Sequence, residues 1–431
     1  TALIMKTKQL KWGVFGVMLA MGTWALTSCE TGSSVSAVKL GKPNLQSFDF
    51  SQMNTPYGKV NIADLMMSKA FKSATFNGGF FPGSGTVDTD MQSASELYSN
   101  DGAQLGRVLF YDKRLSLNNT VACGSCHHQE LAFSDMASLS AGFGGRKTRR
   151  NSMAITNPVI FSNLFWDSRA NSPMDLSLRP VFDHIEMGME SDEMLESKLA
   201  ATDFYPALFM KAFGTTEVTR KRVSIAITQF ISSMITKNSK FDVAVAREFE
   251  KRGITTGGFN NFNGGFGFNI SEAQFSNYNA LEQMGKDLFF SDRARCSRCH
   301  TGENLSAPED PGSGYSAPTV AGSANIGLNR IYVDNGKSDG KFRIPSLRNV
   351  EITGPYMHDS RFTSLDQVVD HYSRGIQPHP HLDKNLMVTG GTAPVRLNFS
   401  QEEKDALVAF LRTLTDVTFL TDKKFSDPFA N

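Results

Sequence analysis

The sequence Cys-x-x-Cys-His occurs twice in this chain of 431 residues. The two copies contain Cys123, Cys126 and His127, and Cys296, Cys299 and His300. This is the attachment sequence of a c-type haem, in which two thiols bond to the porphyrin and the histidine binds the iron. A thioredoxin-like redox pair or a four-cysteine zinc site would leave both histidines without a role. The repeated motif therefore predicts two covalently bound c-type haems that the fold must enclose.

The first 28 residues have the pattern of an export signal. Three lysines precede an apolar run at residues 12–26, and a short small-residue segment ends at Cys29. The run is too short to favour a permanent membrane span, and the pattern resembles a bacterial lipoprotein signal with Cys29 as the lipidation site. A cleaved soluble export signal with a spare cysteine is the alternative. We therefore expect a periplasmic protein held at the membrane through a lipid anchor alone.

Composition limits the remaining possibilities. The formal net charge is +1, and loss of residues 1–28 removes three lysines and no acids, which leaves −2. A charge this small gives no electrostatic case for binding nucleic acid. At 40% hydrophobic residues, a chain of this length can bury the cores of two or three domains.

An internal repeat surrounds the two haem motifs. Residues 106–114 (GRVLFYDKR) precede the first motif, and residues 285–293 (GKDLFFSDR) precede the second. Each segment predicts a short amphipathic helix whose Leu-Phe face packs beneath a haem. The repeat therefore indicates two duplicated domains.

The rest of the pattern is mainly helical. Helices are predicted near residues 62–71, over residues 217–237, and after the capping box formed by Ser400 and Glu403. Residues 253–267 are rich in Gly, Asn and Phe and predict a linker or surface loop. Because extended apolar alternation is scarce, we expect a mainly α fold with little β structure and long loops. It would hold two c-type cytochrome domains in tandem, each with one covalently bound haem.

We expect four segments along the chain. They are a lipoprotein signal peptide at residues 1–28, a tether and N-terminal extension at 29–94, an N-terminal haem domain with a linker at 95–270, and a C-terminal haem domain at 271–431.

Several further motifs accompany the haem sites. They are Arg150-Asn151-Ser152, residues 165–170 (FWDSRA), Pro180 with residues 186–188 (EMG), residues 343–349 (RIPSLRN) and residues 353–359 (TGPYMHD). With these motifs, roughly residues 95–420 resemble the bacterial di-haem cytochrome c peroxidase family, which includes the MauG-type enzymes. The resemblance implies that the N-terminal haem (haem 1) reacts with peroxide and that the C-terminal haem (haem 2) passes in electrons.

The resemblance also implies that haem 1 is open. In switchable members of the family, a histidine in a loop after the first motif blocks the iron. Here the matching loop carries Phe143, which cannot bind iron, so we expect a five-coordinate haem 1 without prior reduction. Rescue by the adjacent His128 or by His184 is the alternative.

Glu186 occupies the family's acid–base position, twenty residues after Trp166. A carboxylate in a confined apolar site suits proton transfer between the two oxygens of a peroxide. The alternative is a glutamate on a helix surface. The family commonly has a glutamine ten residues after the tryptophan, where this chain has Leu176, or Ser177 if the register shifts by one.

The resemblance assigns two further roles, one between the two haems and one at haem 2. By resemblance, Trp166 lies between the haems and relays an oxidising equivalent, although a buried tryptophan is by default a core residue. Tyr372 matches the position where peroxidases carry methionine and MauG-type enzymes carry tyrosine, so it is the favoured distal ligand of haem 2. Met357 and His371 are the alternatives.

A calcium ion between the domains is also implied by the resemblance. Its protein ligands would be the side chain of Asn151 and the carbonyl groups of Thr353 and Pro355, with water supplying the rest. Ordinary turn chemistry at residues 354–355 is the alternative.

The favoured function is a cytochrome-c peroxidase-type oxidoreductase that reduces hydrogen peroxide with electrons from a small cytochrome c or a cupredoxin. The alternative is a MauG-like oxidase that uses peroxide to oxidise a protein or a small organic substrate. A non-catalytic electron carrier would need both irons capped, which Phe143 disfavours. A homodimer is one oligomeric state left open.

Overall fold

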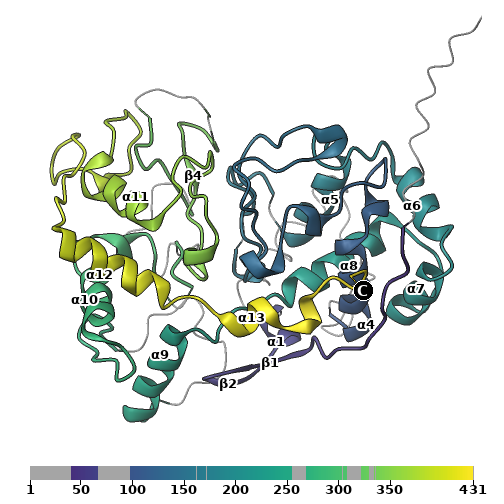
Figure 1. Cartoon of the computed structure of the whole chain (residues 1–431), viewed down its shortest axis with the longest axis horizontal. Coiled ribbons are helices and arrows are strands. Elements are labelled where there is room, and N and C mark those ends of the chain that lie inside the picture. The colour runs from purple at the N-terminus through teal and green to yellow at the C-terminus, as the bar shows by residue number, and fades with distance from the viewer. Residues whose placement is uncertain are drawn as a thin grey trace, which may run out of the picture. The chain divides into compact units, whose positions relative to one another are not determined.

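The computed structural model describes residues 40–66, 98–161, 163–170, 172–254, 268–302, 304–307, 322–329, 334 and 336–430 (Figure 1). Its helices are α1 (Ile62–Met66), α4 (Asn100–Tyr111), α5 (Pro173–Phe182), α6 (Asp192–Ala200), α7 (Tyr205–Phe213), α8 (Arg220–Ser232), α9 (Lys240–Lys251), α10 (Ala280–Phe289), α11 (Leu365–Asp370), α12 (Gln401–Arg412) and α13 (Val417–Thr421). Two antiparallel two-stranded sheets complete it, β1 (Gln52–Thr55) with β2 (Gly58–Asn61) and β3 (Ser323–Ala324) with β4 (Phe342–Arg343). The expected helical fold with little sheet is therefore confirmed for this part of the chain.

Some predictions fall elsewhere. The export signal, Cys29 and residues 255–267 of the Gly-rich segment lie outside the described residues. Within the described ranges, no helix combines the length and the apolar character needed to cross a bilayer.

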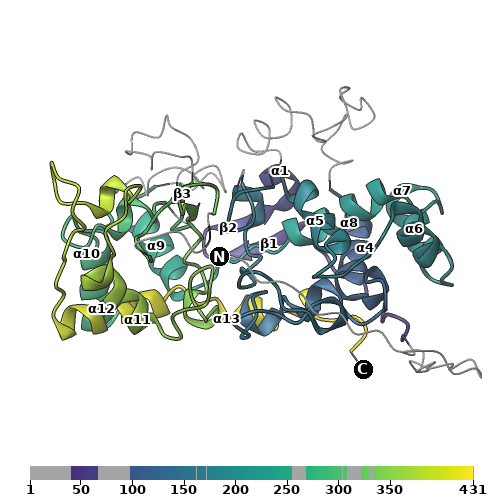
Figure 2. The same cartoon turned by 90° about the horizontal axis from the view of Figure 1, so that it is seen from above.

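The buried apolar side chains form two large cores. Core 1 is built from α4, α5, α6, α7 and α8, and core 2 from α9, α10, α11 and α12. Figures 1 and 2 show these two sets of helices as separate groups in both views. Each core contains one of the two Cys-x-x-Cys-His motifs at its edge, since Cys123 packs against core 1 and Cys296 against core 2.

The same helix contact is built twice. A Cβ atom on Gly106 of α4 would lie 1.9 Å from the carbonyl oxygen of Ala226 in α8, and one on Gly285 of α10 would lie 1.8 Å from that of Ala406 in α12. No side chain fits at such distances, so both positions need glycine. The helix pairs α4–α8 and α10–α12 are therefore equivalent, which extends the sequence repeat to the helices that follow each motif.

The predicted helices beneath the haems are present. Helix α4 contains residues 106–111 and α10 contains residues 285–289, and Phe110 and Phe289 are both buried. The capping box of α12 is also confirmed, because the Ser400 hydroxyl accepts a bond from the Glu403 amide (3.1 Å) and the Glu403 carboxylate accepts one from the Ser400 amide (2.8 Å).

Two predicted helices have other limits. Helix α8 spans Arg220–Ser232 rather than residues 217–237, because the Thr219 hydroxyl caps its start and Ser233 its end. Met234 and Ile235 stay buried after the helix has ended, so the apolar stripe overestimates its length. Helix α1 begins at Ile62 as predicted, and its described part ends at Met66.

Segments near both ends of the described chain cross from one core to the other. Phe50 and Ile62 belong to core 1, while Tyr57, in the turn between β1 and β2, packs against core 2. After α12, the C-terminal segment (residues 416–430) returns to core 1, where Phe419 and Phe425 are buried (Figure 1, yellow). Core membership therefore does not follow chain order.

This C-terminal segment is tied to the first haem motif by hydrogen bonds. Arg107 donates to the carbonyl of Ser426 (2.8 Å), and the Tyr111 hydroxyl donates to that of Phe425 (2.7 Å). Gln129, two residues after His127, donates to the carbonyl of Asp422 (2.8 Å).

A buried ion pair supports the second motif. Arg348 and Asp242 have fully buried side chains and form two bonds of 2.8 Å. Burial alone would raise the pKa of Asp242, but the Arg348 guanidinium holds it below its usual range. Breaking one partner of such a pair costs about 3–5 kcal/mol, so α9 is firmly joined to the loop that carries Arg348.

Candidate functional site

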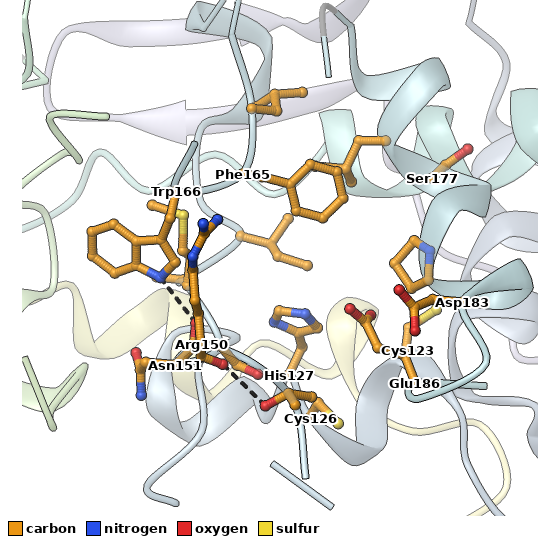
Figure 3. Close-up of a pocket in the computed structure, with 18 of the residues that line it drawn as sticks. Cys123, Cys126, His127, Arg150, Asn151, Phe165, Trp166, Ser177, Asp183 and Glu186 are labelled. Atoms are coloured by element: carbon orange, nitrogen blue, oxygen red, sulfur yellow. Dashed lines mark hydrogen bonds between the residues drawn. The ribbon is translucent and has the colours of Figure 1, made fainter. Parts of the chain in front are cut away.

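The first haem motif lines a cavity of about 720 Å³, here called cavity 1. Cys123, Cys126 and His127 lie on its wall, and it also contains Trp166 and Glu186, which were predicted from the sequence (Figure 3). In Figure 3, His127 lies between Trp166 on one side and Glu186 on the other. The structure therefore brings the attachment residues and both predicted catalytic residues to one cavity.

The imidazole of His127 is oriented for iron binding. Its Nδ1 atom lies 2.7 Å from the carbonyl oxygen of Phe133, which can only accept a hydrogen bond. Nδ1 therefore carries the proton, and Nε2 keeps the lone pair that a haem iron requires. Burial lowers the pKa of His127, which keeps the ring neutral.

The second motif repeats this arrangement in cavity 2, of about 230 Å³, which Cys296, Cys299 and His300 line. The Nδ1 atom of His300 lies 2.9 Å from the carbonyl oxygen of Leu305, and burial lowers the pKa of His300 to about 4. Two thiols and a neutral histidine at the wall of a cavity are the donor set of a c-type haem. The residues present therefore fit a haem at both sites.

The carbonyl groups that fix these histidines could not be identified from the sequence motif alone. Phe133 has φ +60° and Leu305 has φ +48°, a backbone region that is uncommon for such side chains. A single β-bridge accompanies each, His128 with Ser134 and Thr301 with Ser306. The shared signal is a tight loop six or seven residues after the second cysteine.

Glu186 lines cavity 1 and is half-buried. Burial raises the pKa of its carboxyl group, and the neighbouring Asp183 carboxylate raises it further, whereas Arg169 and Arg149 act in the opposite direction. A carboxyl group with a raised pKa can both take and return a proton near neutral pH. Its position excludes the alternative of a glutamate on an open helix surface, and its catalytic role stays a prediction.

Phe143 does not line cavity 1, and the open, five-coordinate haem 1 stays a prediction. Its ring packs against Gly188, where an added Cβ would approach it to 2.8 Å. The Phe143 amide lies within hydrogen-bonding distance of the carbonyl oxygens of Ile185 (2.9 Å) and Glu186 (2.8 Å). The loop thus supports Glu186 from behind instead of blocking the cavity.

The two histidines considered as alternative iron ligands do not line cavity 1 either. Among the described residues, the histidines that line cavity 1 are His127 and His358, whereas His128 and His184 do not. His358 is stacked on Phe342, with ring centres 3.7 Å apart and planes 13° apart.

Leu176 and Ser177, the two candidates for the family's glutamine position, both line cavity 1. The Ser177 hydroxyl lies 2.9 Å from the Met174 carbonyl oxygen and 2.9 Å from the Ser224 hydroxyl. In Figure 3 it points away from His127. Neither residue therefore offers a hydrogen-bond donor to a molecule above His127.

Trp166 lines both cavities and is held by two backbone contacts. Its indole Nε1–H donates to the carbonyl of Asn151 (2.9 Å), and its own carbonyl accepts from the amide of Arg343 (2.7 Å). A side chain fixed between the two cavities is suitably placed for electron transfer between their occupants.

Arg150 stabilises the junction around this tryptophan. Its guanidinium pairs with Asp167 (2.7 Å), next to Trp166, and with Asp334 (2.5 Å), from the second half of the chain. It also lies over the ring of Phe342, 5.5 Å from its centre.

The three candidates for the distal ligand of haem 2 differ in position. Tyr372 and Met357 both line cavity 2, whereas His371 does not. The Nε2 atom of His371 instead lies 2.9 Å from the carbonyl oxygen of Ile326. Burial raises the pKa of the Tyr372 phenol, so it is neutral in the protein without a cation beside it.

The three predicted calcium ligands line the same cavity. Asn151, Thr353 and Pro355 all line cavity 2, and Asn151 lines cavity 1 as well. Within the described ranges, no group of three or more His, Cys, Asp or Glu side chains forms another metal site. Oxygen donors of amide and carbonyl type suit calcium, and these three provide an incomplete set that water must complete.

Comparison with known proteins identifies the family of the chain. Residues 100–250 match the family described as di-haem cytochrome c peroxidase. The crystal structure of a MauG-like protein associated with microbial copper homeostasis is 31% identical, with a TM-score of 0.63, over 79% of this chain and 96% of that one. Cytochrome c551 peroxidase of Nitrosomonas europaea is 28% identical over 73% of this chain and 80% of its own. Methylamine utilization protein MauG of Methylorubrum extorquens is 29% identical over 72% and 77%.

Proposed function

Because the chain belongs to the bacterial di-haem cytochrome c peroxidase family, which includes MauG-type proteins, we propose that it reduces hydrogen peroxide to water in the periplasm. The observation that supports this most directly is the pairing of His127 and Glu186 in one cavity. His127 offers a lone pair for iron, and Glu186 offers a carboxyl group with a raised pKa. Proton transfer by a positioned side chain is the part of peroxide cleavage that the protein itself must supply.

Bound haem supplies the redox-active iron at which the peroxide O–O bond is cleaved. Glu186 accepts the proton of the inner oxygen and returns it to the outer one, which leaves as water. Burial, together with the Asp183 carboxylate, raises the pKa of Glu186, and the loop of Phe143 holds its backbone in place. His127 holds its tautomer through the Phe133 carbonyl throughout.

Electrons would come from a small cytochrome c or a cupredoxin, through cavity 2 and then Trp166. Trp166 lines both cavities, so its side chain could relay electrons from one to the other. We propose Tyr372 as the distal ligand of haem 2, with Met357 as the alternative, since both line cavity 2.

The finer organisation of the chain is part of the same proposal. Two cytochrome domains in tandem would lie near residues 95–270 and 271–431, with α9 contributed by the first segment to core 2. A lipid on Cys29 would anchor the protein after loss of residues 1–28, and Asn151, Thr353 and Pro355 would hold calcium at the junction. A homodimer is the oligomeric state to test.

A MauG-like oxidase is the second candidate, and two observations favour it. The Ser177 hydroxyl is bonded within the protein, so cavity 1 lacks the polar partner that the family's peroxidases commonly place beside the carboxylate. Tyr372 rather than methionine occupies the matching position at cavity 2.

One experiment separates the two candidates. Hydrogen peroxide is added to the diferric protein, with and without a reduced cytochrome c, and the haem spectra are followed by stopped flow. A peroxidase oxidises the cytochrome with many turnovers. Rapid reaction without reductant, followed by poor cytochrome turnover, would select the MauG-like oxidase, and no reaction in either case would reject both.

A further inference from the structure

A third cavity adjoins cavity 1 on the side of Glu186. This cavity 3 has a volume of about 820 Å³ and shares four residues with cavity 1, namely Arg169, Pro180, Asp183 and Glu186. Its solvent side carries the exposed side chains of Arg169, Arg179 and Arg220. Glu186 therefore lies where a cavity accessible from solvent meets the haem 1 cavity.

Part of the wall of cavity 3 is apolar. It is formed by residues of α5, of which Met174 and Leu178 are buried and Phe182 is half-buried. The hydroxyl group in this wall belongs to Ser224, and it is already bonded to the Met174 carbonyl oxygen (3.1 Å) and the Ser177 hydroxyl (2.9 Å). This part of the wall can therefore pack against an apolar group.

The charged rim is already compensated by carboxylates. Arg169 pairs with Asp167 (2.8 Å), Arg179 with Asp175 (2.8 Å) and Arg220 with Asp192 (3.1 Å). Arg220 also lies over the ring of Phe182, 5.0 Å from its centre. Because these guanidinium groups have partners, the rim does not demand an anion, and an uncharged molecule fits better than a small charged one.

The volume of cavity 3 also suits an organic molecule. Cavities that bind small organic molecules measure roughly 300–1,000 Å³, and hydrogen peroxide alone needs far less room than cavity 3 provides. We propose that cavity 3 admits uncharged organic hydroperoxides, with the apolar group in cavity 3 and the peroxide group reaching past Glu186 into cavity 1. This inference rests on the proposed peroxide-reducing function and extends its substrate class.

The reaction balances with the electrons that the proposed function already provides. The O–O bond of the hydroperoxide breaks, and two electrons from the donor protein and two protons convert it to an alcohol and water. Glu186 moves a proton to the leaving alkoxy oxygen, which faces cavity 3 in this arrangement. The alcohol leaves through the cavity by which the hydroperoxide came.

The test compares cumene hydroperoxide with hydrogen peroxide on the haem-loaded protein. Arg179→Trp and Lys221→Trp add bulk to the rim of cavity 3 at residues that do not line cavity 1. We expect each to slow the reaction with cumene hydroperoxide by about tenfold and that with hydrogen peroxide by less than about twofold. Arg222→Trp is the matched control, since Arg222 lies on the same turn of α8 and does not line cavity 3.

A binding measurement accompanies the kinetics. Cumyl alcohol, the unreactive product, should bind the wild-type protein in calorimetry and bind Arg179→Trp about tenfold more weakly. Reaction of the wild type with hydrogen peroxide but not with cumene hydroperoxide would overturn the inference alone. Cumene hydroperoxide rates that neither tryptophan changes would overturn it as well. A wild type that reacts with neither peroxide would reject the proposed function, and absent cumyl alcohol binding would then reject cavity 3 as an organic site.

Discussion

The proximal sides of cavities 1 and 2 are built alike, and the sides facing them are not. In both, two thiols and a histidine line the wall, the histidine Nδ1 is fixed by a carbonyl group, and a glycine brings two helices into contact. Beyond these groups, Glu186 lines cavity 1, whereas Tyr372 and Met357 line cavity 2. The repeated part of the sequence therefore fits cofactor attachment, and we expect the part that differs to determine the chemistry at each haem.

The volumes add to this contrast. Cavity 1 holds about 720 Å³ and adjoins cavity 3, while cavity 2 holds about 230 Å³ and is lined by many apolar side chains. The cavity at the first motif is thus the larger of the two. Substituting a residue that only one of the two cavities has should therefore leave the haem of the other cavity unaffected.

The largest effect is expected for Glu186→Gln. Without a carboxylate to move the proton, the reaction of haem 1 with hydrogen peroxide should slow by about 10²-fold or more, measured by stopped flow. Glu190→Gln is the control, because Glu190 is exposed and lines none of the three cavities. A normal rate in Glu186→Gln would show that Glu186 does not transfer the proton in the peroxide reaction.

The helix contacts should be equally sensitive in both halves. Gly106→Ala and Gly285→Ala force a methyl group against a backbone carbonyl, so each should lower the free energy of unfolding by about 1–3 kcal/mol in denaturant titrations. Gly41→Ala, with nothing within 4 Å, is the control. If the two helix pairs are equivalent, each substitution should first perturb the spectrum of the haem in its own half. A lower free energy of unfolding at only one of the two positions would contradict this equivalence.

Tyr372→Phe tests the distal side of cavity 2. Loss of a tyrosinate ligand should raise the reduction potential of haem 2 and change its EPR signal, while haem 1 remains high-spin. Met357→Leu is the matched change on the alternative ligand. If the leucine variant alters haem 2 and the phenylalanine variant does not, the ligand is Met357.

The pH dependence should show the smallest effect, and cavity 1 alone should show it. Glu186 must be ionised to accept a proton, and its pKa is raised above the ordinary glutamate value by burial and Asp183. The peroxide rate should therefore rise with pH, reach half its plateau at this raised pKa, and lose this limb in Glu186→Gln. The EPR signal of haem 2 over the same range serves as the reference, and a limb that persists in the variant would assign the titration to another group.

The sequence predicted what depends on local pattern. The haem motifs, the helices that carry Phe110 and Phe289, and the capping box of α12 each follow from residues close together in the chain. The packing of Phe143 could not be predicted, because a match to a family position says nothing about which way a side chain packs. Its place is decided by the contact with Gly188, 45 residues further along the chain.

Core membership was also beyond the sequence. The amphipathic stripe of α9 indicates a buried face but not which core buries it, and α9 joins core 2 although it precedes the second motif. The carbonyl groups of Phe133 and Leu305 were missed for a related reason, since any residue can offer a backbone carbonyl.

Because the C-terminal segment crosses into core 1, the two halves of the chain cannot be separated without disrupting that core. A stop codon after residue 415 would spare both haem motifs, yet it would remove Phe419 and Phe425 from the core around the first one. Loss of a buried phenylalanine typically costs about 3–5 kcal/mol, so the damage would appear at the opposite half from the truncation. The segment after the second haem motif thus completes the core around the first, so the N-terminal half cannot be expressed alone without leaving a hole in that core.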